Sequence, residues 1–214
     1  MTGPPLHDVH AVMGNITGIL MATRTEAKPF IEGLGLELIE KKPVPIYGNG
    51  SAVLALCGIG KSSAAIAATD LANRYPLSRI INLGAAGSTG TKFAVGEILH
   101  IGAVYELDRP TLDGDGPVEH RPDTLEGFSL ATLATRDRPV LEKEDRTAAG
   151  IYADLVDMEG AAVVQACRAL DLEVNLFKIV TDTAGCSVKE IIGNIVATRD
   201  SLFEFFRDRV MPLL

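Results

Sequence analysis

The stretch Leu155-Val156-Asp157-Met158-Glu159-Gly160-Ala161-Ala162 joins a short apolar strand to an alanine- and valine-rich helix. The helix is expected over residues 159–170, and an apolar strand over 174–180 then ends just before Asp182. A strand, a helix and a strand of this length predict a right-handed parallel crossover. Such a crossover brings Glu159 and Asp182 to the carboxyl-terminal edge of one sheet, where α/β sheets bind ligands. Two carboxylates at one crevice indicate either a metal site or acid–base chemistry on a polyhydroxylated ligand.

The rest of the chain also alternates strands with helices. Apolar runs predict strands at 16–22, 43–47, 51–57, 79–83, 96–107, 128–135 and 151–157, and helical patterns cover 26–34, 61–75 and 191–210. Gly48-Asn49-Gly50 is typical of a hairpin turn, and the polar segment 108–127 is expected to be a surface loop or flap. The alternation predicts a mostly parallel or mixed sheet in an α/β sandwich. Residues 1–14 are expected to form a loose tail, and residues 15–214 a single domain.

The composition narrows the classes of partner. The chain has 214 residues, of which 47% are hydrophobic and 22% charged, as in an ordinary soluble globular enzyme. Its net charge of −8 argues against a nucleic-acid partner, because phosphate binding needs a basic face. No apolar run is long enough to span a membrane, and the first residues do not resemble a signal peptide. We therefore expect a cytoplasmic protein with no membrane partner.

The cysteines and histidines show no metal-binding spacing. Cys57, Cys167 and Cys186 lie far apart and form no CxxC pair, which argues against a disulfide framework and a zinc ribbon. Cys57 and Cys167 lie in apolar runs and are interpreted as small core residues. The four histidines have no partner at ligand spacing, so neither a metal site nor a Ser-His triad is predicted.

Two glycine-rich turns resemble known motifs without matching them. Cys57-Gly58-Ile59-Gly60-Lys61-Ser62 lacks the first glycine of a phosphate loop, because Ala55 stands in its place. It is interpreted as a tight turn between a strand and a helix. Ser88 does not fit a nucleophile elbow, because Ala86 stands where that motif needs glycine.

Each candidate acid also has an ordinary structural interpretation. Glu26 fits a capping box that begins at Thr23. Asp157 and Glu159 could complement a helix dipole, and Asp182 could cap the last helix. Taken together they indicate a site, since Glu26, Glu159 and Asp182 each follow a buried strand.

Four segments of the chain resemble the nucleoside phosphorylase/nucleosidase superfamily. They are Gly18-Ile19-Leu20-Met21-Ala22 with Glu26, Gly58-Ile59-Gly60-Lys61, Ile80-Ile81-Asn82-Leu83-Gly84-Ala85-Ala86-Gly87 with Val95-Gly96-Glu97-Ile98, and Val156-Asp157-Met158-Glu159-Gly160 with Thr181-Asp182. The resemblance is greatest to methylthioadenosine/S-adenosylhomocysteine nucleosidases and to futalosine hydrolase. It implies a three-layer α/β sandwich, in which helices flank a central mixed twisted sheet.

The resemblance also implies roles for individual residues. Glu26 would position or activate the attacking water, and Asp182 would donate a proton to N7 of the purine. Met158 and Glu159 would hold the ribose, with Glu159 on its 2′- and 3′-hydroxyls. Asp157, Gly84 and Ala85 complete the expected substrate-binding set. Chemistry of this kind needs a general acid in a dry pocket, because a purine is a poor leaving group until N7 is protonated.

The implied reaction is hydrolysis of the N-glycosidic bond of a purine nucleoside, such as 5′-methylthioadenosine, S-adenosylhomocysteine or a related adenine nucleoside. Phosphorylases of this fold carry a phosphate loop after the first strand, where only Arg24 could serve a phosphate here. The alternatives are a futalosine hydrolase, a phosphorylase that uses Arg24 and the Gly84 loop, and a nucleoside-binding protein without turnover. The resemblance also implies a homodimer or higher oligomer, and no metal or cofactor is expected.

Overall fold

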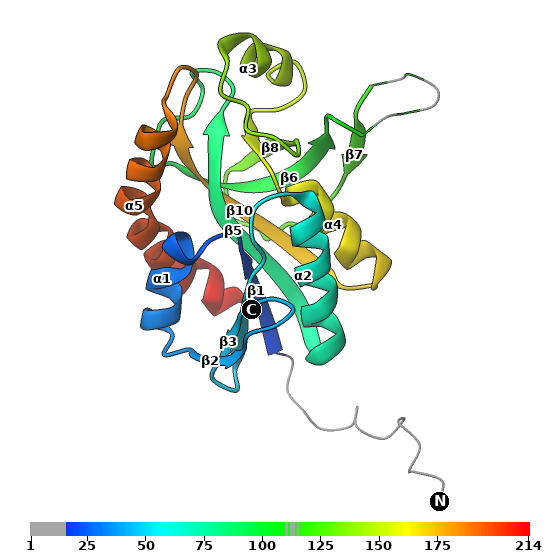
Figure 1. Cartoon of the computed structure of the whole chain (residues 1–214), viewed down its shortest axis with the longest axis vertical. Coiled ribbons are helices and arrows are strands. Elements are labelled where there is room, and N and C mark those ends of the chain that lie inside the picture. Colours follow the sequence, from blue (N-terminus) through cyan, green and yellow to red (C-terminus); the bar gives the residue numbers. More distant parts are fainter. Residues whose placement is uncertain (1–15, 110, 112–113, 115) are drawn as a thin grey trace, which may run out of the picture.

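Helices lie on both faces of one mixed sheet, and the sheet contains ten strands among the residues that the structure describes (Figure 1). The computed structural model describes residues 16–109, 111, 114 and 116–214, so the predicted tail lies outside it. The strands are β1 (Ile16–Met21), β2 (Glu37–Glu40), β3 (Ile46–Gly48), β4 (Ala52–Leu56), β5 (Leu77–Ser88), β6 (Ile98–Glu106), β7 (Val118–His120), β8 (Leu130–Thr135), β9 (Leu155–Asp157) and β10 (Glu173–Asp182). The α-helices are α1 (Arg24–Gly33), α2 (Lys61–Arg74), α3 (Lys143–Ala149), α4 (Gly160–Ala169) and α5 (Val188–Phe205), and α5 is followed by a π-helix (Phe206–Val210) and a 3-10 helix (Met211–Leu213).

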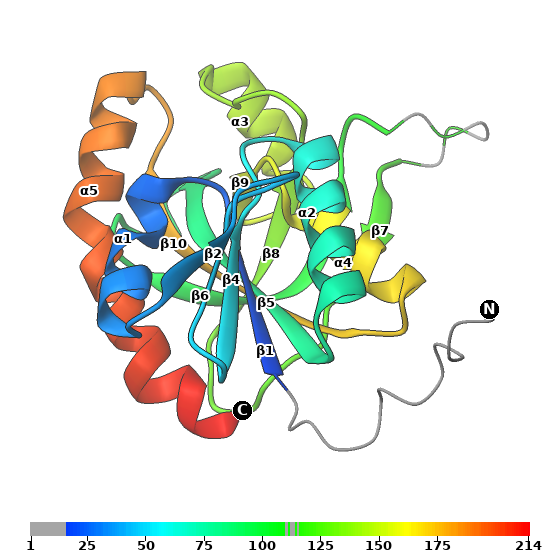
Figure 2. The same cartoon turned by 60° about the horizontal axis from the view of Figure 1, so that its bottom comes forward.

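The predicted three-layer α/β sandwich is confirmed. Helices α1 and α5 pack together on one face of the sheet and α2 and α4 on the other (Figures 1 and 2). Strand β1 is buried on both faces, which explains its continuous apolar run. Ile19 and Met21 contribute to the core beneath α1 and α5, and Leu20 to the core beneath α2 and α4. This alternation follows from the two-residue side-chain period of a strand.

Part of the sheet closes on itself, because β10 pairs with both β6 and β5. Its order is β10-β6-β8-β9-β5-β1-β4-β3-β2, and β10 also pairs with β5. The predicted parallel crossover around α4 is wrong: β9 is antiparallel to β5, whereas β10 is parallel to it. Both strands still reach the same point, because Gly87 of β5 pairs with Val156 on one side and with Asp182 on the other. The residues after β9 therefore face the end of β10 across the end of β5.

Capping boxes set the start of two helices. Thr23 caps α1 with Glu26, as predicted, and Ser187 caps α5 with Glu190. Helix α5 therefore begins before the predicted residue 191, and the interpretation of Asp182 as its cap is wrong. Pro29 lies inside α1, beyond its first turn. The Thr25 carbonyl, which a proline at this position leaves without its helical partner, accepts a hydrogen bond from Arg199 Nη1 at 3.1 Å.

Several connections differ from the predictions. The segment 108–127 contains a short strand, β7, and residues 84–87 continue β5 instead of ending it. Helix α3 was not predicted. The hairpin between β3 and β4 and the tight turn at Gly58 and Gly60 are confirmed, with positive φ at both of these glycines. In the described part of the chain, no helix has the length and apolar character needed to cross a membrane.

Candidate active site

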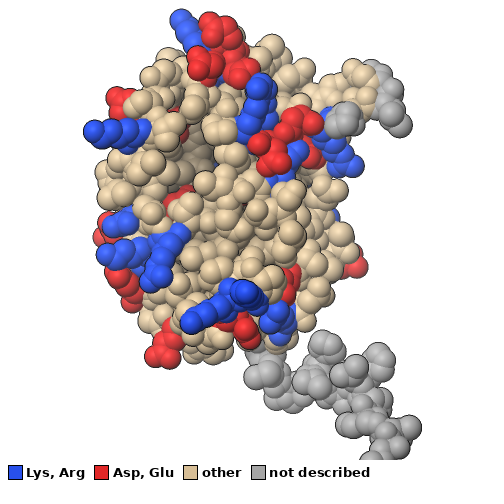
Figure 3. All heavy atoms as spheres, in the orientation of Figure 1, with Lys and Arg blue, Asp and Glu red and all other residues tan. Residues whose placement is uncertain are grey.

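A cavity of about 310 Å³ opens where β1, β5, β9 and β10 end. Glu26, Glu159 and Asp182, which are distant in sequence, all line it. Figure 3 shows the surface hollowed between α5 and α3. Most of the remaining wall is apolar, and the apolar side chains that line it are Ala22, Ile59, Ala85, Ala86, Pro139, Val140, Leu141, Val156, Met158, Val188, Ile191, Ile192 and Ile195. Such a wall with few polar groups is typical of a small-molecule site.

Glu26 is held by both of its carboxylate oxygens. Its Oε2 accepts hydrogen bonds from Thr23 N at 3.1 Å and from Thr23 Oγ1 at 2.6 Å, which completes the capping box. Its Oε1 accepts one from Ala85 N at 3.0 Å, which links α1 to β5. The capping interpretation of Glu26 is therefore confirmed, and the cap orients a buried carboxylate that also lines the cavity.

Glu159 is hydrogen-bonded to the turn before α2. Its Oε1 accepts a hydrogen bond from Gly60 N at 2.9 Å, and it makes no cap to its own helix. Burial, reinforced by the nearby charge of Asp157, raises the pKa of Glu159 to about 7. Glu26 adds to this shift, which places the two carboxylates within electrostatic reach of each other.

Asp157 fixes the corner between β9 and α4, which consists of residues 157–160 and includes Met158 and Glu159. Its Oδ1 accepts from Thr135 Oγ1 at 2.6 Å, and its Oδ2 accepts from Gly160 N at 2.8 Å, so it does serve the start of α4. Lys178 Nζ lies 2.9 Å from Oδ2, and both side chains are buried. Burial lowers the pKa of Lys178, but the charges of Asp157 and Glu159 outweigh burial and raise it. Lys178 is therefore a buried cation that balances the carboxylates of this corner.

Asp182 is paired with a residue that the sequence did not predict. Its Oδ2 accepts a hydrogen bond from Arg146 Nη2, and its Oδ1 accepts one from Thr181 Oγ1 at 2.9 Å. Arg146 comes from α3, is buried and also lines the cavity. This end of the cavity therefore holds a guanidinium–carboxylate pair.

Comparison with known proteins identifies the family. The model of the phosphorylase superfamily matches residues 17–126 and 123–208, which together span most of the chain. The chain belongs to the phosphorylase superfamily.

Its curated relatives are nucleosidases. The 5′-methylthioadenosine/S-adenosylhomocysteine nucleosidase of Mycobacterium tuberculosis is 26% identical over 198 residues, covering 68% of this chain and 76% of the relative. The enzyme of the same name from Bacillus subtilis is 27% identical over 167 residues, covering 65% and 71%. The resemblance to these nucleosidases is thereby confirmed, and it supports an enzyme that hydrolyses nucleoside N-glycosidic bonds.

Solved structures share the fold. A Helicobacter pylori methylthioadenosine nucleosidase mutant with 5′-methylthioadenosine in its active site has a TM-score of 0.83 and 17% identity, covering 94% of this chain and all of the other. A futalosine hydrolase mutant from the same organism has a TM-score of 0.83 and 16% identity, covering 92% and 99%.

The cavity brings together most of the predicted site residues of this superfamily member. Asp157, Met158 and Ala85 line it with the three acids. Gly84 stands behind Glu26, since a Cβ at Gly84 would lie 3.0 Å from Glu26 Oε1. Gly84 is not among the residues that line the cavity, and its lack of a side chain lets β5 approach that carboxylate closely.

Sequence reasoning missed Arg146, Lys178 and the apolar wall from α5. Arg146 lies in the charged run Glu142-Lys143-Glu144-Asp145-Arg146, where nothing distinguishes it from exposed neighbours. Lys178 interrupts a strand that is otherwise apolar, and a lysine in such a strand signals a buried carboxylate partner. That signal was available in the sequence.

Proposed function

We propose that this chain hydrolyses the N-glycosidic bond of a purine nucleoside with water as the nucleophile. The observation that carries the proposal is that Glu26, Glu159 and the Asp182–Arg146 pair share one mostly apolar cavity. Carboxylates placed around a sugar offset the positive charge that builds on it as the bond breaks. The sequence relatives that are nucleosidases support the same reaction.

In this proposal Glu26 positions the water and accepts its proton. The water oxygen bonds to C1′ of the sugar while the C1′–N9 bond breaks, and the electron pair of that bond leaves with the purine. The net transfer is a hydroxyl to the sugar and one proton to the base. Because Thr23 and Ala85 fix both oxygens of Glu26, its carboxylate is oriented before the substrate binds.

Met158 and Glu159 would bind the ribose. Glu159 has one oxygen engaged by Gly60 N, which leaves acceptor capacity for sugar hydroxyls. Asp182, which lines the same cavity, would donate to N7 the proton that the departing purine needs, and Arg146 lies against its carboxylate.

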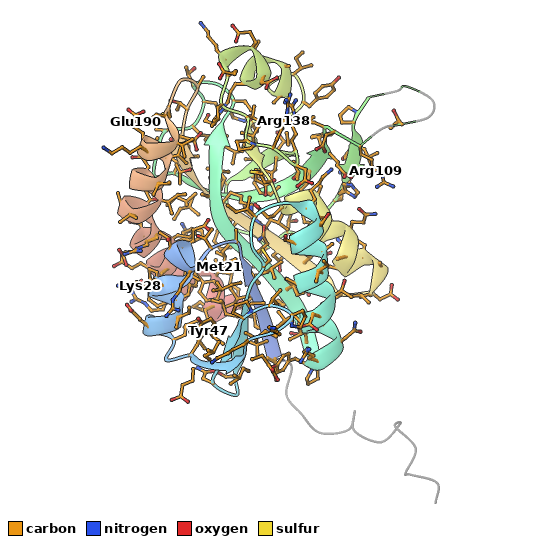
Figure 4. The ribbon with its side chains drawn as sticks, viewed as in Figure 1. Met21, Lys28, Tyr47, Arg109, Arg138 and Glu190 are labelled. Atoms are coloured by element: carbon orange, nitrogen blue, oxygen red, sulfur yellow. The ribbon has the colours of Figure 1, made fainter. Side chains whose placement is uncertain are left out.

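The position of Arg24 supports water over phosphate. Arg24 is exposed and lines a groove between α1 and α5 together with Lys28 and Arg199. Figure 4 shows Lys28 at the outer edge of the molecule. Arg24 is not among the residues that line the cavity. The amide of Ala85, which follows Gly84, is taken by Glu26. Of the candidate phosphate ligands, Arg24 therefore lies outside the cavity lining, and the amide in the Gly84 loop already donates to Glu26.

The first candidate substrates are 5′-methylthioadenosine and S-adenosylhomocysteine, for which the relatives are named. Val188, Ile191 and Ile192 of α5 supply an apolar wall that suits a thioether substituent. Futalosine is a second candidate, because a futalosine hydrolase is structurally as similar as the nucleosidases.

The test is incubation with methylthioadenosine, S-adenosylhomocysteine, adenosine, inosine and futalosine, with and without phosphate. Release of free base that does not depend on phosphate is the expected result. Sugar 1-phosphate formed only with phosphate would establish a phosphorylase, and tight binding without turnover would establish a binding protein.

We further propose a homodimer or higher homo-oligomer in the cytoplasm. Val188, Ile192 and Val196 form an exposed apolar stripe on α5 at the mouth of the cavity, where a second copy would cover them. A strictly monomeric species in light scattering would contradict the assembly. The free, buried thiols of Cys57 and Cys167 suit a reducing compartment.

A further inference from the structure

Asp137 holds the turn before α2 from another part of the fold. Its Oδ1 accepts a hydrogen bond at 2.9 Å from the backbone N of Lys61, which is the first residue of α2. The residue before it, Gly60, supplies no side-chain cap, so Asp137 takes up an amide that the helix itself leaves without a partner. A Cβ on Gly60 would lie 2.7 Å from the same oxygen, so the Asp137 carboxylate lies directly against the turn.

Three hydrogen bonds join this turn to the corner that carries Glu159. They run from Lys61 N to Asp137 Oδ1, from Arg136 N to Asp157 O at 3.1 Å, and from Gly60 N to Glu159 Oε1. Gly60 and Lys61 are neighbours in sequence, as are Arg136 and Asp137, and Glu159 is two residues from Asp157. The three bonds and the short pieces of backbone between them therefore form a closed ring. In such a ring the place of the Gly60 amide depends on the bond to Asp137.

The loop after β6 braces this ring. Asp108 Oδ2 accepts a hydrogen bond from Asp137 N at 2.7 Å, and its Oδ1 accepts one from Lys61 Nζ at 2.6 Å. Burial raises the pKa of Asp108, but the hydrogen bonds from Lys61 and from the Asp137 amide outweigh burial and lower it. Asp108 thus connects the backbone of Asp137 to the side chain of the residue whose amide Asp137 holds.

We propose that Asp137 is a positioning residue for the ribose site: by holding the amide of Lys61 it keeps the Gly60 amide on Glu159. Asp137 is exposed and is not among the residues that line the cavity, so it acts through the turn and not by touching a ligand. The inference rests on the proposed function, in which Glu159 binds the sugar. A carboxylate with one oxygen held in place presents its remaining acceptor sites in a fixed direction.

The test compares Asp137→Ala with Asp137→Asn. Asparagine loses the charge but keeps an oxygen that can accept from Lys61 N, whereas alanine removes the acceptor. A hydrogen bond changes an equilibrium constant by about 2–10-fold. Asp137→Ala should therefore raise KM for methylthioadenosine by about that factor. Because the sugar is held in the ground state and the transition state alike, kcat should change little, and Asp137→Asn should resemble wild type.

A second measurement follows Glu159 without any substrate. Carbon-13 NMR of the glutamate carboxyl groups gives its titration, and Glu159→Gln assigns the signal. Burial, Asp157 and Glu26 raise the pKa of Glu159, whereas Lys178 and the Gly60 amide lower it, and the buried thiol of Cys57 lies within electrostatic reach.

The two substitutions should move this titration differently. Asp137→Ala should raise the pKa of Glu159 by about 0.4–1 pH unit, because the Gly60 amide no longer stays on the ionised carboxylate. Asp137→Asn should not raise it, because removing a negative charge alone favours ionisation of a neighbouring carboxyl group. Asp70→Ala is the matched control, since Asp70 contacts Arg74 near the other end of α2. It should leave KM and the titration of Glu159 as in wild type.

Several results would overturn the proposal. Equal effects of Asp137→Ala and Asp137→Asn would show that the charge of Asp137 acts and not its hydrogen bond. Wild-type behaviour of Asp137→Ala, a loss of kcat at constant KM, or a rise in KM without a change in the titration would each contradict the assignment as well. If the titration responds as expected but wild type hydrolyses no nucleoside, the proposed function fails while Asp137 still positions Glu159.

Discussion

Glu159 Oε1 lies 2.9 Å from Gly60 N, and this hydrogen bond joins residues 99 positions apart. It connects the corner after β9 to the turn before α2, and Glu159 and Ile59 from these two segments line the cavity. The donor is a backbone amide, so its position depends on the conformation of the turn. The Glu159 carboxylate is buried near Asp157, and both its burial and the charge of Asp157 disfavour its ionised form in the folded protein.

Stability should fall with rising pH because of Glu159. Its pKa is raised from 4.5 to about 7 in the folded protein. Between these values the folded state holds a proton that the unfolded state has lost, so the free energy of unfolding decreases as pH rises. Glu159→Gln does not titrate there. Urea unfolding at pH 5 and pH 8 should show wild type losing about 1–3 kcal/mol relative to Glu159→Gln. If the difference in unfolding free energy between wild type and Glu159→Gln is the same at pH 5 and pH 8, this prediction is wrong.

Glu26→Gln should reduce kcat with little change in nucleoside binding. The amide keeps the shape of the side chain but is a poor proton acceptor, and general-base assistance is typically worth about 10²–10⁴-fold. Steady-state kinetics on methylthioadenosine and binding of free adenine separate the two effects. Glu32→Gln is the matched control, because Glu32 is exposed on the same helix and contacts Lys28. Wild-type turnover by Glu26→Gln would remove Glu26 from the chemistry.

Lys178→Met should destabilise the fold severely. It leaves Asp157 as a buried carboxylate without its cation, and breaking a buried pair in this way costs about 3–5 kcal/mol. Lys178→Met combined with Asp157→Asn should recover part of that loss, as measured by urea unfolding. A loss below about 1 kcal/mol for the single variant would show that the pair carries little of the stability.

Gly60→Ala should damage both the fold and ribose binding. Gly60 has φ of +99°, and an added Cβ would lie 2.7 Å from Asp137 Oδ1. A non-glycine residue in such a conformation costs of order 1–3 kcal/mol. Because the Gly60 amide also holds Glu159, the Michaelis constant for a nucleoside should rise. Gly50→Ala is the control: φ is +89° there, but no atom lies within 4 Å of the added Cβ. Equal effects of the two substitutions would mean that backbone strain alone accounts for the loss.

Much of the fold could be predicted because its signals are local. Apolar runs marked most of the strands, with β1 correct to within one residue at its end, but the short strands β2 and β7 were not predicted. The Thr23–Glu26 capping box and the glycine turn before α2 depend only on neighbours in sequence, and both were recovered. Helix α3 was missed, because it is short and carries no capping side chain.

The sequence by itself determined most of the strands, the cap of α1 and the identity of the acids that line the cavity. The tertiary structure decided the direction of β9, the burial of Arg146 and the outward position of Arg24. The physical reason is that strand direction and side-chain burial depend on partners far away in sequence. Arg146 is buried because Val140, Ser88 and Asp182 accept its hydrogen bonds, and only the closed sheet brings those acceptors together.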